Sequence, residues 1–422
     1  MNQKKPLGIY IHIPFCMSKC AYCDFLSGPA EEGIQKEYVQ ALHAQIEAYQ
    51  FLANEYEVRT IFIGGGTPSS IDATDIKDIL SHVYRIFNID SSRIGNVEIP
   101  DNKSSNGVGS KVAGIEITIE ANPGTLTKEK LLTYKEAGIN RISMGLQSTN
   151  NTELRLLGRI HTYEQFEENY HLARECGFNN INVDLMSALP GQTIDTWEAT
   201  LEKICSLDPE HISAYSLIIE EGTPFYEKYA DQEGLPSEEE DRFMYHKTRT
   251  MLRDAGYERY EISNYAKPGY ESKHNCSYWE RIDYIGFGLG ASSCIDTIRF
   301  HNEEHLQEFI RQKDIYGQNE RLPEVFGKDE KVQLLHKLGA KEIHVLPIQE
   351  QMEEFMFLGL RMMKGIDIES FNKIFQAEFN TIYGHTVDEM CREGLLERVD
   401  HKVRLTERGI DISNYVMSEF LL

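Results

Sequence analysis

Three cysteines lie within eight residues near the start of the chain, at Cys16, Cys20 and Cys23. They follow the alternating apolar run Leu7 to Ile13, which predicts a strand that ends at this loop. Thiolates bind zinc and iron-sulfur clusters. An iron-sulfur cluster held by three cysteines keeps one iron without a protein ligand, and that open position can bind a small molecule.

A zinc site is the alternative for this loop. Structural zinc normally takes four protein ligands, often as two closely spaced pairs. The chain has no second pair of cysteines, and His12 is the nearby imidazole that could complete a tetrahedron. The remaining cysteines are single: Cys176, Cys205, Cys276, Cys294 and Cys391. The lack of a second cysteine pair, together with a strand that would place the loop at one end of a sheet, therefore favours a cluster over zinc.

The composition limits the partners of this acidic chain. Its 422 residues include 43 Lys or Arg and 67 Asp or Glu, a formal net charge of -24. Such a surface repels nucleic acid and anionic membranes, although local basic patches stay open. No apolar run approaches the ~20 residues of a membrane span, and the basic start is not followed by a secretory core. Single cysteines in a long chain fit a reducing compartment, so we expect a cytoplasmic protein.

Strand-like and helical runs alternate through the first two thirds of the chain. Helical spacing recurs from Ile34 to Tyr49, and further helices are expected from Asp72 and after a cap at Thr127. The expected strands span residues 7–13, 60–63, 115–120, 141–146, 181–185 and 211–217. Six strand-helix units predict an α/β fold with a parallel sheet, doubly wound or curled into a partial (βα)6 barrel. The predicted strands end in polar or glycine-rich residues. This favours the barrel, because the functional sites of barrels lie at the carboxyl ends of the strands.

The rest of the chain predicts an insertion, a connector and a second domain. Residues 88–114 are rich in Ser, Asn and Gly and predict a surface insertion. We expect the barrel in residues 1–310, a polar connector in 311–346 and a mostly helical, winged-helix-like domain in 347–422. The expected elements of that domain are helices at 352–363, 368–379 and 386–393, a hairpin at 396–405 and a final helix. Residues 366–422 carry six Lys or Arg and eleven Asp or Glu, which favours a structural or protein-contact role over DNA binding.

Glycine and polar residues follow several of the predicted strands. The run Gly64-Gly-Gly-Thr-Pro68 follows the second strand, and its glycines allow a ligand to approach the backbone closely, although a tight turn would need them too. Glu120, Gln147 and Asp184 stand at later strand ends, and Arg159 lies in a connection. These groups predict a polar ligand, with carboxylates for an ammonium group or ribose hydroxyls and Arg159 for a carboxylate.

The cysteine loop, with Tyr22 before the last cysteine, and the glycine turn resemble radical S-adenosylmethionine (SAM) proteins. The run from Tyr10 to Cys16 is similar to the oxygen-independent coproporphyrinogen III oxidase group, and this resemblance covers nearly the whole chain. It implies a 4Fe-4S cluster on the three cysteines, with SAM bound to the free iron. It also implies a SAM pocket lined by Tyr10, Tyr22, Gly65, Gly66, Thr67, Glu120, Gln147, Arg159 and Asp184, with Ser216 and Ser292 as further candidates.

Two departures separate the chain from the oxidases of that group. Phe25 stands where they carry a further cysteine. They also carry a longer N-terminal segment that helps bind substrate, whereas only fifteen residues precede Cys16 here. The run His274-Asn-Cys-Ser-Tyr-Trp279 instead resembles a signature of the haem-chaperone branch, and Gly286-Phe-Gly-Leu-Gly290 also fits.

Four residues of this signature are candidates for haem contact: His274, Cys276, Tyr278 and Trp279. Imidazole and thiolate are haem ligands, and aromatic rings stack on porphyrins. The alternative is a hydrogen-bonded corner of the fold.

Two functions therefore stand side by side. In the first, the protein binds haem and passes it to an acceptor protein that the sequence does not name, with peripheral contact to membrane-bound acceptors left open. In the second, it is a radical SAM oxidoreductase of the coproporphyrinogen dehydrogenase type. Phe25, the short N-terminal segment and the 274–279 signature favour the chaperone.

Overall fold

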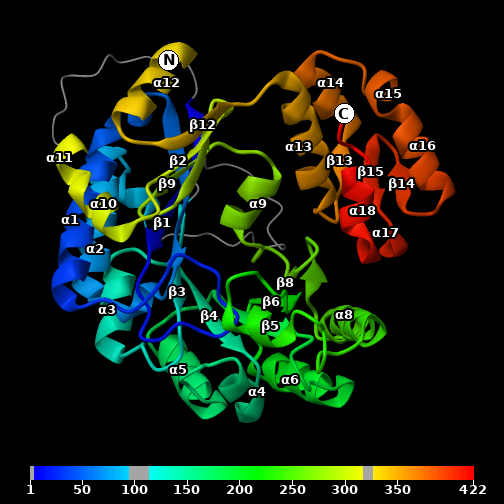
Figure 1. The fold of residues 1–422 in the computed structure, drawn as a ribbon, viewed down its shortest axis with the longest axis horizontal. Coiled ribbons are helices and arrows are strands. Elements are labelled where there is room, and N and C mark those ends of the chain that lie inside the picture. Colours follow the sequence, from blue (N-terminus) through cyan, green and yellow to red (C-terminus); the bar gives the residue numbers. More distant parts are fainter. Residues whose placement is uncertain (1–3, 95–113, 317–326) are drawn as a thin grey trace, which may run out of the picture.

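A computed structural model describes residues 4–94, 114–316 and 327–422. In this part of the chain, a sheet of twelve strands forms the larger domain, and its six central strands are parallel and adjacent in chain order (Figure 1). These strands are β1 Lys5–Ile13, β2 Tyr56–Gly65, β3 Glu116–Ala121, β4 Arg141–Gln147, β5 Ile181–Ser187 and β6 His211–Ser216. The order β1 to β6 does not close on itself, which confirms the predicted partial barrel.

Helices cover the outer face of the six strands (Figure 1). They are α1 Glu32–Ala48, α2 Ala73–Ile86, α3 Lys128–Glu136, α4 Asn151–Leu156, α5 Tyr163–Glu175, α6 Ile194–Leu207 and α8 Glu238–Asp254, with short 3-10 turns at Gln50–Asn54, Pro68–Ser70 and Ser91–Arg93. The short helix α7 Pro224–Tyr229 packs instead against Ala21 and Tyr22 of the cysteine loop. Asp72 and Thr127 cap α2 and α3 through their side chains, as the sequence predicts.

Each central strand has two chemically different faces. On β3, Ile117 and Ile119 are fully buried in the core shared with the helices. Because side chains alternate along a strand, Glu116, Thr118 and Glu120 point to the opposite face, which is the barrel interior. The strands therefore carry apolar groups toward the helices and polar groups toward the centre.

Further strands extend the sheet on both sides. They are β7 Glu258–Arg259 and β8 Asn264–Ala266 beyond β6, and β9 Tyr284–Phe287, β10 Ser292–Ile295, β11 Ile298–His301 and β12 Lys341–Val345 beyond β1. The accompanying helices are α9 Lys273–Trp279, α10 Leu306–Arg311, α11 Lys313–Tyr316 and α12 Lys328–Lys337.

The expected connector at 311–346 differs from the structure. Strand β12 pairs with β11 in the large sheet, and Leu334, Leu335 and Leu338 of α12 and its C-terminal end pack into the barrel core. Three apolar side chains on one face are enough to anchor a helix whose other face is polar. Most of the expected insertion at 88–114 lies outside the described residues.

The C-terminal domain has its own core, which includes Met356, Leu360, Phe371, Phe379 and Val387. Its elements are α13 Ile348–Leu360, β13 Ile366–Asp367, α14 Ile368–Phe375, α15 Phe379–Ile382, α16 Gly384–Arg392, β14 Leu396–Val399, β15 Lys402–Leu405, α17 Glu407–Asp411 and α18 Ser413–Ser418. Helices followed by a hairpin match the predicted winged-helix-like order, although the last helix is split in two. No helix in the described ranges is long and apolar enough to cross a membrane.

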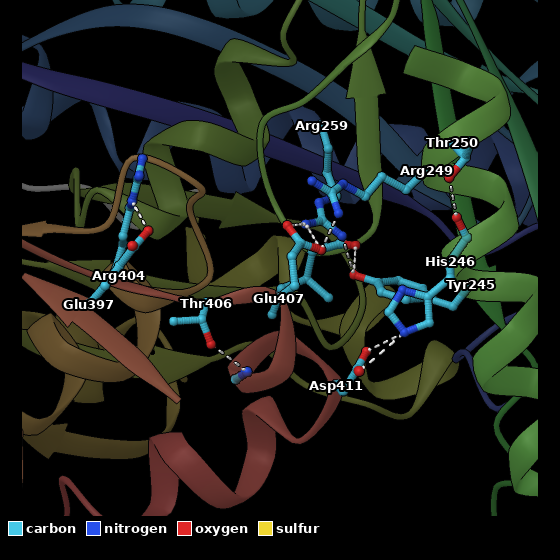
Figure 2. Close-up of polar contacts among 12 residues, drawn as sticks. Tyr245, His246, Arg249, Thr250, Arg259, Glu397, Arg404, Thr406, Glu407 and Asp411 are labelled. Carbon is cyan, nitrogen blue, oxygen red and sulfur yellow. Dashed lines mark hydrogen bonds and ion pairs between the residues drawn. The ribbon is translucent and has the colours of Figure 1, made fainter. Parts of the chain in front are cut away.

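Ion pairs join the C-terminal domain to the barrel (Figure 2). Glu407 of α17 accepts from Arg249 Nη1 at 2.6 Å and from Arg259 Nη2 at 2.9 Å. Next to them, His246 Nε2 lies 3.1 Å from an Asp411 oxygen. Since the side chain of Arg259 is only 6% exposed, its charge depends on Glu407 for compensation.

Candidate functional site

The cysteine loop leaves the end of β1 and is fixed by backbone hydrogen bonds. Cys16 N donates to Gly28 O at 3.0 Å, and Ala21 N donates to Leu157 O at 3.0 Å. Cys16, Cys20 and Cys23 are half-buried, and all three line one cavity of about 340 Å³ at the carboxyl ends of the barrel strands. We call this the cluster cavity.

The cluster cavity brings together most of the residues that the sequence predicts for a ligand site. Tyr22, Gly65, Gly66, Thr67, Glu120, Gln147, Arg159, Asp184 and Ser216 all line it. Because parallel strands end at the same edge of the barrel, residues far apart in sequence meet there. Two predicted residues, Tyr10 and Ser292, line a neighbouring cavity instead.

The glycine turn lies directly against the cysteine loop. A Cβ on Gly66 would be 2.8 Å from Phe15 O and 3.0 Å from Cys16 Sγ. Gly65 has a φ of +112°, and a Cβ there would lie 2.5 Å from the His12 ring. Both positions therefore need glycine, one for close approach and the other also for its backbone conformation.

Two carboxylic acids point into the floor of the cluster cavity. Glu120 Oε2 accepts from Gly65 N at 3.0 Å, and Asp184 accepts from Ser143 Oγ at 3.1 Å and from Asn182 Nδ2 at 2.8 Å. Burial and the neighbouring Asp184 raise the pKa of Glu120 to about 8, and burial also raises the pKa of Asp184. A cationic ligand would relieve this penalty by stabilising the ionised carboxylates.

Arg159 crosses from the cavity wall to the cysteine loop. Its Nη1 donates to Cys20 Sγ at 3.5 Å, and its Nη2 donates to Asn122 Oδ1 at 2.6 Å. Its Nε is buried and has no hydrogen-bond partner among the described residues, so it is available to a ligand. Sequence reasoning missed Asn122, which also donates to Thr67 Oγ1 at 2.7 Å. Its position two residues after Glu120, just past the end of β3, is the signal that could have identified it.

A second cavity, of about 440 Å³, adjoins the cluster cavity and shares Asp24 and Phe25 with its lining. Tyr10 OH lies 3.0 Å from His12 Nδ1, and His12 Nε2 lies 3.1 Å from Leu26 O. Burial lowers the pKa of His12, so its ring is neutral at pH 7 and uses both nitrogens in these bonds.

Comparisons with known proteins cover nearly the whole chain. Residues 10–204 match the radical SAM superfamily model, and residues 346–412 match the HemN C-terminal domain model. The protein named heme chaperone HemW in Lactococcus lactis is 33% identical over 99% of this chain and 98% of its own length. Its Bacillus subtilis namesake is 34% identical over 98% of each chain. The chain belongs to the HemW family of the radical SAM superfamily.

Solved structures support the same fold for this HemW family member. Coproporphyrinogen III oxidase (HemN) from Escherichia coli, described as a radical SAM enzyme, aligns with a TM-score of 0.77 at 20% identity. The alignment covers 99% of this chain and 90% of that one, so both domains share the HemN arrangement.

The signature at 274–279 lies on α9 and contributes no residue to the lining of the cluster cavity, although Tyr278 lines the second cavity that adjoins it. His274 is 1% exposed, and its Nδ1 lies 2.8 Å from Thr60 Oγ1 while its Nε2 lies 2.9 Å from Tyr278 OH. Burial and the charge of Arg141 lower its pKa to about 3. Both ring nitrogens are therefore engaged within the protein, and neither is free for a metal.

The outer side of the 274–279 segment of this HemW family member faces the C-terminal domain. The Trp279 ring lies 4.4 Å from the guanidinium carbon of Arg361, so one face of the indole is covered. Cys276 is half-buried and lines a separate cavity at the junction of the two domains. Among the described residues, no three His, Cys, Asp or Glu side chains are placed to hold one metal ion.

Proposed function

We propose that the protein is a haem chaperone that carries a 4Fe-4S cluster on Cys16, Cys20 and Cys23 and exchangeable SAM. The observation that carries this proposal is that the three cysteines open onto one cavity with ionisable groups on its floor. Support for the haem function comes from the relatives named heme chaperone HemW, which match this chain end to end at 33% and 34% identity.

The residues around the cysteine loop fit a cluster. Thr67 Oγ1 lies 3.6 Å from Cys16 Sγ, and Arg159 Nη1 lies 3.5 Å from Cys20 Sγ, so two sulfurs have donors that stabilise thiolates. In a cluster each cysteine binds its own iron, and the three sulfurs need only share one cavity. When bound, the cluster supplies an iron with an open position for the amino and carboxylate groups of SAM.

The protein's own residues would then position SAM. Gly66 allows the ligand and the cysteine loop to approach the backbone, and Arg159 Nε can donate to a carboxylate. Glu120 and Asp184 can accept from an ammonium group or from ribose hydroxyls. Tyr22, half-buried beside the loop, covers the apolar side of the cavity.

The alternative function is a radical SAM oxidoreductase acting on coproporphyrinogen III. It is favoured by the HemN-like fold across both domains. Against it, Phe25 replaces the further cysteine of the oxidases and is 58% exposed at the cavity mouth. A phenyl ring cannot supply the hydrogen or the ligand that a thiol could supply at that position.

Anaerobic purification followed by spectroscopy tests the proposal. We expect about four iron and four sulfide per chain, a cluster spectrum that changes on adding SAM, and a haem absorption band that moves to an acceptor on mixing. Stoichiometric zinc without sulfide would overturn the cluster assignment. Formation of vinyl groups from coproporphyrinogen III with SAM and a reductant would overturn the chaperone in favour of the oxidoreductase.

We place this function in the cytoplasm, with the barrel as the cofactor domain and residues 347–422 in a structural or protein-contact role. The net charge of the chain supports a protein rather than a nucleic acid as the partner. Membrane-bound acceptors would be reached by peripheral contact. The acceptor itself must be found by haem transfer assays.

A further inference from the structure

A cavity of about 500 Å³ lies at the junction of the barrel and the C-terminal domain. Its lining includes Tyr260, Lys273, Cys276, Met362, Met363 and Lys364. It shares no lining residue with the cluster cavity. In Figure 1, α9, which carries Cys276, stands between the barrel sheet and α13. We call this the junction cavity.

The junction cavity is unusual in its sulfur donors. Met363 is half-buried and Met362 is buried, and a methionine thioether carries no proton to lose when it binds a metal. Cys276 is half-buried on the facing helix, where burial and the nearby Glu280 raise its pKa to about 12. Thioether and thiolate are both known axial ligands of haem iron.

Backbone contacts hold Met362 and Met363 against the barrel. Met363 N donates to Tyr260 O at 3.0 Å, and Met362 forms an isolated bridge with Glu261. Arg361, the residue before Met362, donates from Nη2 to Glu261 Oε2 at 3.2 Å. The sulfur side chains therefore project from a segment that is paired with the barrel rather than from a free loop.

The charged side chains that line the cavity have both signs, three acidic and three basic. Lys273 and Lys364 are exposed there, and Lys273 forms no ion pair within the described part of the chain. Lys364 pairs with Glu280, while Glu258 and Glu271 also line the cavity. A bound carboxylate group would have to compete with these acids, so the lysines give selectivity rather than large affinity.

Other places in the molecule are poorer sites for haem iron. In the second cavity, beside the cluster cavity, both nitrogens of His12 are used in hydrogen bonds. The same is true of His274 inside the barrel. The junction cavity instead offers soft donors that no hydrogen bond or metal site engages among the described residues.

We propose that haem binds in the junction cavity, with sulfur from Met363 and Cys276 on the iron and the two propionates toward Lys273 and Lys364. This inference rests on the proposed function, in which haem is the cargo. Ligation by Cys276 releases the thiol proton to solvent and changes no oxidation state. The cavity is bounded by both domains, so a small shift between them would open the haem to an acceptor.

Haem titration of the full chain under anaerobic conditions tests the sulfur ligands. In the Cys276→Ala/Met363→Leu double variant we expect a shifted absorption band and haem affinity at least about tenfold lower, since even indirect partners of a metal are worth that much. The matched control is Cys391→Ala/Met417→Leu, which removes two half-buried sulfur groups outside the cavity and should bind haem as the wild type does. Iron and sulfide content should stay constant in both, which shows that the barrel is intact.

A second experiment tests the propionates. Lys273→Glu/Lys364→Glu should bind haem about tenfold more weakly, a loss of roughly 1.4 kcal/mol, but should bind haem dimethyl ester as tightly as the wild type does. Wild-type affinity and band shape in the sulfur double variant would overturn the inference, as would equal losses for haem and its ester. If the wild type itself bound no haem, the proposed function would fail instead, so the two failures are distinguishable.

Discussion

Replacing Gly66 by alanine is the most direct test of how the glycine turn supports the cysteine loop. The new Cβ would lie 2.8 Å from Phe15 O, whereas an ordinary contact begins near 3.4 Å. The loop would therefore have to retreat by roughly half an ångström, against the hydrogen bond from Thr67 N to Phe15 O at 2.7 Å. Overpacking of this kind costs about 2 kcal/mol. If that cost falls on the cluster-bound state, cluster affinity drops roughly thirtyfold.

Iron and sulfide content after anaerobic reconstitution is the readout, together with SAM binding measured at equilibrium. The matched control is Gly33→Ala in α1, where a Cβ meets nothing within 4 Å and the backbone is helical. That variant should keep full cluster content and gain slight stability, because alanine favours a helix over glycine. A Gly66→Ala protein with wild-type cluster content and SAM affinity would refute the close approach on which the site depends.

Three further predictions test the charges and hydrogen bonds of the fold. Because the pKa of Glu120 is about 8, its carboxyl ionises as pH rises through that value, so SAM affinity should increase about tenfold from pH 7 to 9. Glu120→Gln should lose this increase, and a slope that persists in the variant would assign it to another group. Glu407→Gln should lower the free energy of unfolding in urea by about 1 kcal/mol, since Arg249 and Arg259 lose an ionic partner that is itself 44% exposed and partly screened by solvent; an unchanged midpoint would contradict this. His274→Ala should cost about 3 kcal/mol of stability by removing its bonds to Thr60 and Tyr278, yet leave the haem band unchanged. Loss of the band in a folded variant would restore His274 as a ligand.

The sequence predicts the central barrel well because its signals are local. Each of the six strands is a short apolar run, and polar or glycine residues mark where each one ends. Parallel strands must place those ends on one edge, so the order of the strands alone is enough to group Glu120, Gln147 and Asp184. The caps at Asp72 and Thr127 follow from local hydrogen bonding in the same way.

Other features depend on contacts that leave no local pattern. The polar stretch 311–346 resembles a connector, but β12 joins the sheet through pairing with β11, which lies well before it in the sequence. Tyr10 belongs to the right strand, yet it lines the second cavity, where its OH lies 3.0 Å from His12 Nδ1. The direction of His274 into the barrel is set by Thr60 and by Glu116, whose Oε1 accepts from His274 N at 3.1 Å.

Helix α9 and the cluster cavity are joined by the same pair of strands. On β2, Thr60 contacts His274 in the middle of the strand, while Gly65 donates to Glu120 at its carboxyl end. On β3, Glu116 holds the backbone of α9 and Glu120 lies four residues further along, in the cluster cavity.

The signature helix α9 can therefore serve two purposes with different faces. Its inward residue His274 closes the barrel beneath the cluster cavity, and its outward residue Cys276 lines the junction cavity. If the binding of SAM or of haem shifts β2 or β3, that shift would alter both sites, since packed elements transmit small displacements. If so, SAM binding should alter haem affinity in the wild type but less in a His274→Ala variant, because the hydrogen bond that ties α9 to β2 is absent there. Equal SAM effects on haem affinity in both proteins would show that the two sites act independently.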